Sequence, residues 1–207
     1  MKLKSAWVLM ALGAFTLSSC GTALVVGAGT EVTRTVLQER STMDALKDTE
    51  IQITLNNKYI RHSTGLFADV STDVHEGRVV LTGTVPDRAD KITATKLAWE
   101  TEGVLSVADE LVVKEDSGVA AYAEDAWISN QLRFALLTDI DVRSVNYNVE
   151  TVDKVIHVTG LARSGPELER VMDHARSVPG VVRVISHVLT IDDPRREVAG
   201  GDAGKTG

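Results

Sequence analysis

The sequence predicts an α+β protein made of two tandem αββαβ units, each with a three-stranded mixed sheet and two helices. The first observation is an internal repeat, because Thr82-Gly83 recurs 77 residues later as Thr159-Gly160. The same offset relates an acid and several apolar residues without a gap. The second observation is that helical and strand periodicities alternate in the same order in each unit. A tandem duplication therefore organises the chain.

The composition limits the classes of function. The chain has 207 residues, a formal net charge of −7 and 43% hydrophobic residues, which is typical of a globular protein. A nucleic-acid partner is not expected, because binding to phosphates needs clustered Lys and Arg. Cys20 is the single cysteine, so the sequence excludes an intramolecular disulfide and a cysteine-based zinc site.

The N-terminus has the features of a bacterial lipoprotein signal. Residues 1–19 contain a basic start, an apolar segment from Ala6 to Phe15, and Ser18 and Ser19 directly before Cys20. This resembles a lipobox, and the resemblance implies cleavage before Cys20, a covalent diacylglycerol on its sulfur and an N-acyl chain on its amine. No other cofactor is expected. An ordinary secretory signal or an uncleaved anchor is the alternative, although the apolar segment is short for a membrane span.

Residues 20–45 are expected to form a lipidated tether. Gly21 stands where lipoproteins retained in the inner membrane carry Asp, so the resemblance implies the outer membrane, on its periplasmic face. The start of the tether is too short and too rich in glycine for a stable membrane span.

The first unit covers residues 46–115. Apolar residues at helical spacing predict a first helix, alternation predicts two strands joined at Glu76-Gly77, and Pro86-Asp87 starts a second helix that Gly103 ends. The predicted elements are a helix at 48–61, strands at 68–75 and 78–85, a helix from 87 to 102 and a strand at 104–113.

The second unit covers residues 124–193 and repeats this order. A helix is expected at 125–137, a hairpin turn near Asp153-Lys154, a helix between Pro166 and Pro179, and a last strand at 181–191. Residues 116–123 are expected to form a short linker, and the polar tail at 194–207 is expected to be disordered because it has nothing to bury.

The ordered pattern of each unit resembles the BON domain. The first unit carries it at Asp48, Ile51, Leu55, Val79, Leu81, Thr82, Gly83, Val85, Gly103, Val104, Val107 and Leu111. The second unit carries it at Asp125, Ile128, Leu132, Ile156, Val158, Thr159, Gly160, Gly180, Val181, Val184 and Val188, with Ala162 in place of the last strand Val. The resemblance implies binding to phospholipid or other envelope surfaces. A lipobox before two BON domains implies an outer-membrane lipoprotein that supports envelope integrity, including at division sites.

Positions that differ between the units are the candidates for function. Trp127 and Phe134 stand where the first unit has Glu50 and Asn57, and they lie within about 20° of each other on a helix. An indole suits the headgroup boundary of a membrane. The flanking polar residues, Asn130 and Arg133, could meet lipid phosphates. The resemblance implies that this first helix of the second unit contacts anionic phospholipid.

Two alternatives remain open for these aromatic residues. They could pack against the first unit or the linker as an interdomain core, or they could bind an envelope protein, which makes the chain a scaffold module. Residues 124–193 contain seven Arg and Lys against eleven Asp and Glu, net −4, which does not favour an anionic bilayer.

The remaining candidates for chemistry are weak. His157 and His187 fall on strands of one unit, but two histidines without an acid at ligand spacing predict solvent-facing residues, so no metal site is expected. The paired acids Asp109-Glu110 resemble a solvated strand end. Trp99 aligns with Arg176 of the second unit, and it is expected to fill the core rather than to cover the junction between the units. The sequence has no catalytic motif, so it predicts no catalytic residue and no enzyme.

Overall fold

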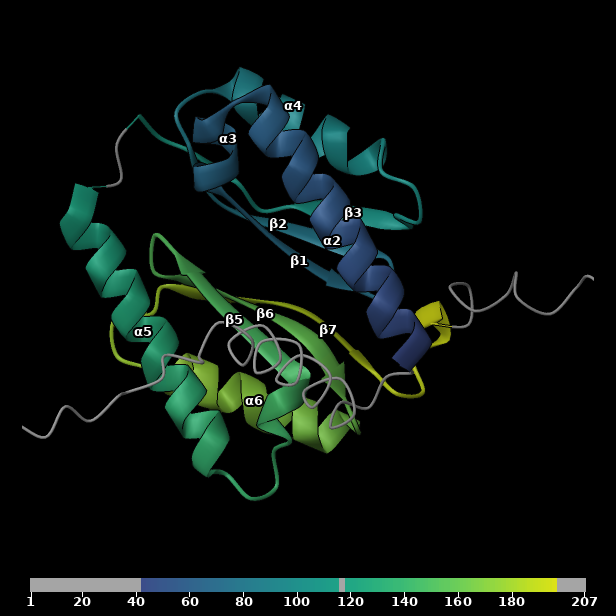
Figure 1. The fold of residues 1–207 in the computed structure, drawn as a ribbon. Helices are drawn as coiled ribbons and strands as arrows, with labels where there is room; N and C mark the ends of the chain where they lie inside the picture. Colours follow the sequence, from purple (N-terminus) through teal and green to yellow (C-terminus); the bar gives the residue numbers. More distant parts are fainter. Residues whose placement is uncertain (1–41, 116–117, 197–207) are drawn as a thin grey trace, which may run out of the picture. The chain divides into compact units, whose positions relative to one another are not determined.

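The computed structural model describes residues 42–115 and 118–196, and Figure 1 shows their fold. The predicted signal at 1–19, the lipidation site Cys20 and most of the predicted tether lie outside the described residues.

The first repeat contains three helices and a mixed sheet. In chain order its elements are α2 (Thr42–His62), α3 (Thr64–Asp69), β1 (Val70–His75), β2 (Arg78–Val85), α4 (Arg88–Trp99), β3 (Ser106–Asp109) and β4 (Val112–Val113). Strand β1 pairs antiparallel with β2, and β3 and β4 pair with β2 in parallel.

The second repeat has the same order around a three-stranded sheet. Its elements are α5 (Gly118–Thr138), the 3-10 turn η1 (Ser144–Asn146), β5 (Tyr147–Val152), β6 (Val155–Ala162), α6 (Gly165–Ser177), β7 (Arg183–Thr190) and the 3-10 turn η2 (Pro194–Arg196). The strand order is β5-β6-β7, with β5 antiparallel and β7 parallel to β6. The predicted α+β class with tandem αββαβ units is confirmed.

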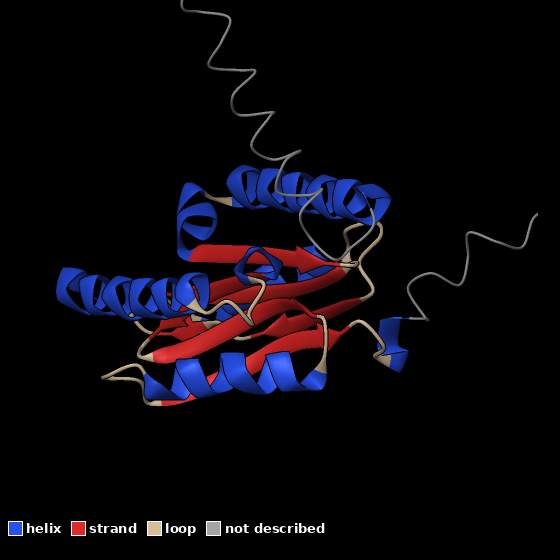
Figure 2. Cartoon of the chain, turned by 90° about the horizontal axis from the view of Figure 1, so that it is seen from below, coloured by secondary structure: helices blue, strands red, loops and turns tan. Residues whose placement is uncertain are grey.

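Each repeat has its own hydrophobic core between its helices and its sheet (Figure 2). The first core gathers Ile51, Leu55 and Tyr59 of α2 with residues of β1, β2 and α4. The second core gathers Ile128 and Leu132 of α5 with the corresponding residues of β5, β6 and α6. The apolar periodicity that the repeats share therefore forms their cores.

The shared acid of the pattern joins the first helix to the hairpin turn. The carboxylate of Asp48 accepts hydrogen bonds from the amides of Glu76 and Gly77, both at 2.8 Å. In the second repeat, Asp125 accepts hydrogen bonds from Asp153 and Lys154 at 2.9 and 2.8 Å. Each acid thus satisfies two turn amides that the strand ladder leaves over.

Helix and strand ends depart from the predicted ones at several points. Helix α2 begins at Thr42, where Ala45 adds to its buried face, and α3 occupies the start of the expected strand at 68–75. Helix α4 ends at Trp99, and Gly103 follows with a φ of 84°. The expected strand at 104–113 is divided into β3 and β4, because the Asp109 carboxylate accepts a hydrogen bond from the Leu111 amide.

Within the described residues, regular structure extends into the expected linker and into the start of the expected tail. Helix α5 begins at Gly118, so most of the expected linker at 116–123 is helical. The start of the tail expected to be disordered at 194–207 forms η2, because Arg196 pairs with Glu76 at 2.7 Å and Arg195 pairs with Asp193 at 2.7 Å. These ion pairs give the tail a partner that its own composition does not reveal.

Candidate membrane-contact surface

Helix α5 has two apolar faces, of which only one packs on its own sheet. The packed face carries Ile128, Leu132 and Leu136, which are at most 2% exposed. At 100° per residue, a second group of large apolar residues occupies an arc of about 140° that is centred roughly opposite the packed face. We call this group the α5 outer face, and it consists of Val119, Tyr122, Trp127, Phe134 and Leu137.

The α5 outer face is exposed in the described structure. Trp127 is 47% exposed and Phe134 is 65% exposed, so neither fills a core between the repeats. Tyr122 and Leu137 are 74% and 71% exposed. Contiguous exposed aromatic and aliphatic side chains of this kind mark an interaction surface.

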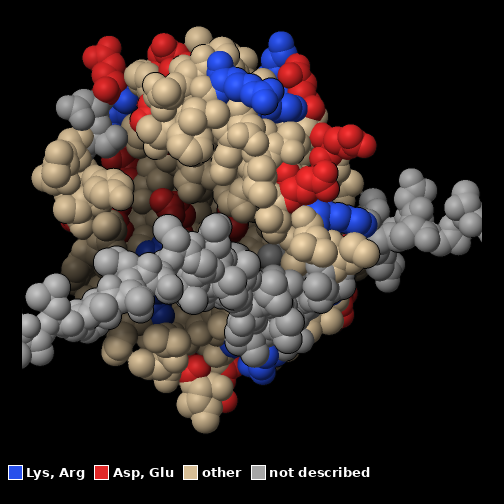
Figure 3. Space-filling model, viewed as in Figure 1, with Lys and Arg blue, Asp and Glu red and all other residues tan. Residues whose placement is uncertain are grey.

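The acidic residues of α5 point away from its outer face. Glu124 pairs with Lys154 at 2.8 Å, and Asp125 accepts the two amides of the β5–β6 turn. Arg133 is the single basic residue of the helix. The start of α5, at the left of Figure 3, accordingly shows almost no charged atoms. The outer face of the helix thus carries exposed apolar side chains and no acidic side chain.

The predicted polar pair lies within the arc of this face. Arg133 donates one hydrogen bond to Oδ1 of Asn130 at 3.3 Å and another to the carbonyl of Val149 on the edge strand β5. Both side chains are exposed. Because a guanidinium has five N–H donors, the bonds to Asn130 and Val149 leave donors that can meet a phosphate. The structure therefore brings Asn130 and Arg133 together and gives Arg133 a structural contact that the sequence did not indicate.

The outer face extends further than the sequence analysis indicated. Tyr122 and Val119 lie in the segment expected to be a linker, and their helical spacing with Trp127 was the signal that could have identified them. In the first repeat, buried Ala45 replaces Tyr122. A large aromatic outer face is therefore particular to the second repeat.

Helix α2 of the first repeat has a different exposed apolar row. Leu46, Ile53 and Ile60 recur every seven residues and are 60%, 57% and 46% exposed. Trp99 on α4 is 55% exposed, so the expectation that it fills the core was wrong. These exposed apolar residues of the first repeat can serve as controls for the α5 outer face in binding experiments.

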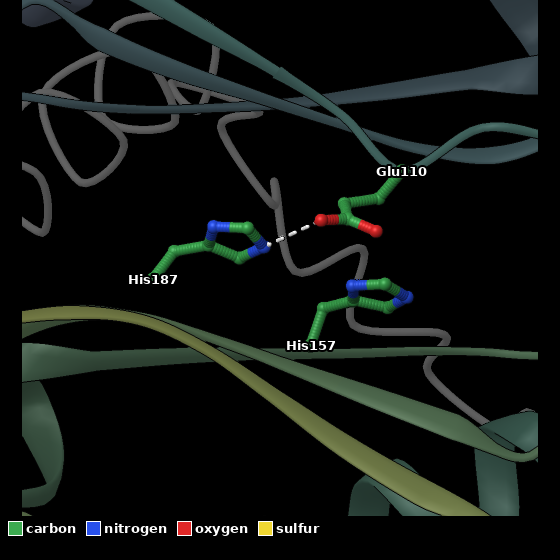
Figure 4. A group of neighbouring side chains, drawn as sticks. All are labelled: Glu110, His157 and His187. Atoms are coloured by element: carbon green, nitrogen blue, oxygen red, sulfur yellow. Dashed lines mark ion pairs between the residues drawn. The ribbon is translucent and has the colours of Figure 1, made fainter.

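A second group of side chains corrects another prediction. His157 is 3% exposed, and His187 and Glu110 are partly buried, so the two histidines and the acid do not simply face solvent. The three side chains point toward one another, His157 from β6, His187 from β7 and Glu110 from the segment between β3 and β4 (Figure 4). Nε2 of His187 lies 3.3 Å from Oε1 of Glu110. The acid that the histidines lacked in the sequence comes from the other repeat.

Among the described residues, no helix combines the length and the hydropathy that crossing a bilayer requires.

Comparison with known proteins identifies the family. The BON domain matches residues 46–115 and 124–191. An uncharacterized protein in the gshII 5' region of Anaplasma centrale is 35% identical over 144 residues, which are 69% of this chain and 94% of that protein. Osmotically-inducible protein Y of Escherichia coli is 30% identical over 147 residues, or 70% and 73% of the two chains. The outer membrane lipoprotein DolP of Haemophilus influenzae is 27% identical over 172 residues, or 82% and 88%. The chain belongs to the BON-domain family.

Proposed function

We propose that this chain is a non-enzymatic lipoprotein of the bacterial outer membrane that binds phospholipid through the α5 outer face. In this proposal, acyl chains on Cys20 hold the protein on the periplasmic side of the membrane, and the second repeat contacts the lipid surface beside the anchor. The similarity to the outer membrane lipoprotein DolP supports this location. A contribution to envelope integrity, including at division sites, is part of the proposal.

The observation that carries the proposal is the exposed, acid-free outer face of α5. Trp127 and Phe134 remain 47% and 65% exposed although the helix is already packed on its own core. Complete transfer of such a side chain from water to an apolar phase is worth about 1.5–3 kcal/mol. An indole also suits the headgroup boundary, because its ring enters the apolar layer while its N–H stays hydrated.

The acidic charge of the second repeat is largely engaged in ion pairs. Asp139 lies 2.7 Å from His174, Glu167 lies 2.8 Å from Arg163, and Glu124 lies 2.8 Å from Lys154. Paired acids repel an anionic surface less than free ones do at short range. In this proposal, contact with anionic phospholipid depends on Arg133, the one basic residue of α5, which lies within the outer face.

Vesicle flotation tests the proposal. A chain that starts at Arg34 keeps both hydrophobic cores and lacks Cys20, so acylation does not contribute to binding. We expect this chain to float with phosphatidylglycerol vesicles, and we expect Trp127→Glu to reduce the floated fraction several-fold while the circular dichroism spectrum stays unchanged.

Trp99→Glu is the matched control, because Trp99 is similarly exposed at 55% but lies on α4 of the first repeat. This variant should bind like the parent chain. Equal loss in both variants, or full binding by Trp127→Glu, would remove the α5 outer face from the lipid contact.

The alternative is a scaffold that binds an envelope protein through the same face. The net charge of −4 of the second repeat favours it, because a protein partner does not require a basic surface. In that case the chain does not float with phosphatidylglycerol or with phosphatidylcholine vesicles. Flotation with both lipids would instead indicate apolar insertion without a headgroup preference.

A further inference from the structure

Glu110, His157 and His187 meet where the two repeats touch. Glu110 lies between β3 and β4 of the first repeat, while His157 and His187 lie on β6 and β7 of the second repeat. In the parallel register, Thr159 is the Cα partner of His187, so the two histidines lie two positions apart on one face of the sheet. Their rings are nearly parallel, with an interplanar angle of 10° and centroids 6.3 Å apart (Figure 4).

The repeat itself places the acid opposite a histidine. Glu110 and His187 occupy equivalent positions, 77 residues apart; His187 lies on β7, and Glu110 lies between β3 and β4. The equivalent of His157 is Val80, which is 6% exposed. The equivalent positions 110 and 187 therefore face each other across the contact between the repeats. One carries a carboxylate and the other an imidazole, which can pair with each other.

We propose that Glu110, His157 and His187 form a binding site for a divalent transition-metal ion, with Zn²⁺ as the best match. Two imidazoles and one carboxylate are a common ligand set for this ion, with solvent as the fourth ligand. Because the acid comes from one repeat and the imidazoles from the other, the bound ion links the two BON domains.

The distances suit this coordination. One ligand atom from each residue lies within 4.8 Å of the others. In a tetrahedral site with bonds of about 2.0–2.2 Å, ligand atoms are roughly 3.3 Å apart. Nε2 of His187 and Oε1 of Glu110 are already 3.3 Å apart. The proposal requires side-chain rotation to close the remaining distance.

Burial gives the imidazoles a reason to bind an ion. Among the described residues, Nδ1 of His157 has no hydrogen-bond partner although the side chain is 3% exposed. A buried polar atom in this condition costs free energy that a ligand can recover. Burial also lowers the pKa of His157 to about 4 and keeps the pKa of His187 below its usual value despite Glu110. Burial thus favours the neutral imidazole, which is the form that binds metal ions.

The surroundings provide access and charge. His187 lines a cavity of about 450 Å³ between the repeats, which gives an ion a route and leaves room for a water ligand. The carboxylate of Asp73 accepts a hydrogen bond from Thr159 and acts electrostatically on His187. Together, Glu110 and Asp73 supply two negative charges near the site, which balance a divalent cation.

Zinc titration of the full chain in detergent tests the site. After removal of metal with a chelator, we expect one Zn²⁺ per chain by calorimetry and a rise in Tm on saturation. Glu110→Gln should weaken binding at least ~10-fold, since it removes a direct ligand. His157→Val, which introduces the residue of the equivalent position in the first repeat, should do the same. His174→Ala is the control, because His174 pairs with Asp139 outside the cluster.

Cobalt gives a second readout, because visible d–d bands of intensity typical of tetrahedral coordination should appear in the parent chain and vanish in Glu110→Gln. If His157→Val unfolds, Glu110→Gln remains decisive, because Glu110 lies outside the strands and both hydrophobic cores. The absence of stoichiometric zinc binding in the parent chain overturns the proposal. So does parental affinity in Glu110→Gln, which would place the ion elsewhere.

Discussion

At the scale of single residues, Glu167 shows how a buried acid is stabilised. It is 5% exposed at the start of α6, and its carboxylate accepts hydrogen bonds from the Arg143 amide at 2.8 Å and the Arg163 amide at 3.0 Å. The side chain of Arg163 adds a third bond at 2.8 Å. Burial alone raises the pKa of Glu167, but these bonds outweigh it and hold the pKa below its usual value.

This shift predicts a pH dependence of stability. Because the pKa is lower in the folded than in the unfolded state, Glu167 stabilises the fold above its unfolded pKa, and the contribution disappears as pH falls through the folded pKa. Glu167→Gln should lower the unfolding free energy by about 1–3 kcal/mol at pH 7 and flatten its decline toward acidic pH. Urea titrations from pH 7 to pH 3 measure this. Glu169→Gln, an exposed neighbour on α6, should keep the parental slope.

At the scale of elements, the glycine shared by β2 and β6 lets two backbones approach. Gly160 has a φ of 134°, and a Cβ atom there would lie 2.0 Å from the Asn146 carbonyl oxygen. Gly83 has a φ of 121° and the same relation to Asp69, at 2.1 Å. The Thr-Gly pair that revealed the duplication therefore serves the close contact between each central strand and the start of its hairpin.

Gly160→Ala should destabilise the protein by at least about 2 kcal/mol, because both the φ angle and the close contact oppose a side chain. Thermal unfolding followed by circular dichroism measures the effect. Gly165→Ala is the control, since Gly165 begins α6 and has no atom within 4 Å of an added Cβ. Similar Tm values for the two variants would contradict this explanation of the conserved spacing between the repeats.

At the scale of the whole molecule, contacts between the repeats come from the strand faces, the segment after β4 and the C-terminal turn. Lys114 pairs with Asp153 at 2.8 Å, Arg196 pairs with Glu76 at 2.7 Å, and Thr159 donates to Asp73. Strand β6 is buried along nearly its whole length for this reason. A shared scaffold strand thus also serves the contact between the domains.

The proposed membrane location gives a prediction at the same scale. Replacing Cys20 by Ser should prevent acylation. The protein should then either leave the membrane fraction or keep the mass of the unprocessed chain. Fractionation and the mass of the mature chain measure this. A Ser19→Ala variant keeps the cysteine and should remain acylated and membrane-bound. Unchanged membrane association and mass in Cys20→Ser would contradict the lipoprotein assignment.

Local periodicity and turn chemistry determined the core elements of both repeats. The spacing of Ile51, Leu55 and Tyr59 gave the core face of α2, and Asp153-Lys154 gave the second hairpin turn. Helix ends were less predictable, because α5 begins at Gly118 in a segment whose composition resembles a linker. Comparison of the repeats could identify the aromatic side chains of α5 as candidates for function. Their exposure could not be predicted, because it depends on how α5 packs in the folded chain.

The sequence by itself therefore determined the duplication, the αββαβ order and the residues that each repeat buries on its own helices, because these follow from local spacing. Only the tertiary structure decided which strand faces are buried by the other repeat as well as by the helices of their own repeat. It buried His157, brought Glu110 of one repeat to His187 of the other, and left Trp127 and Phe134 exposed. The physical reason is that contacts between the repeats join residues distant in the chain, and no local pattern encodes such partners.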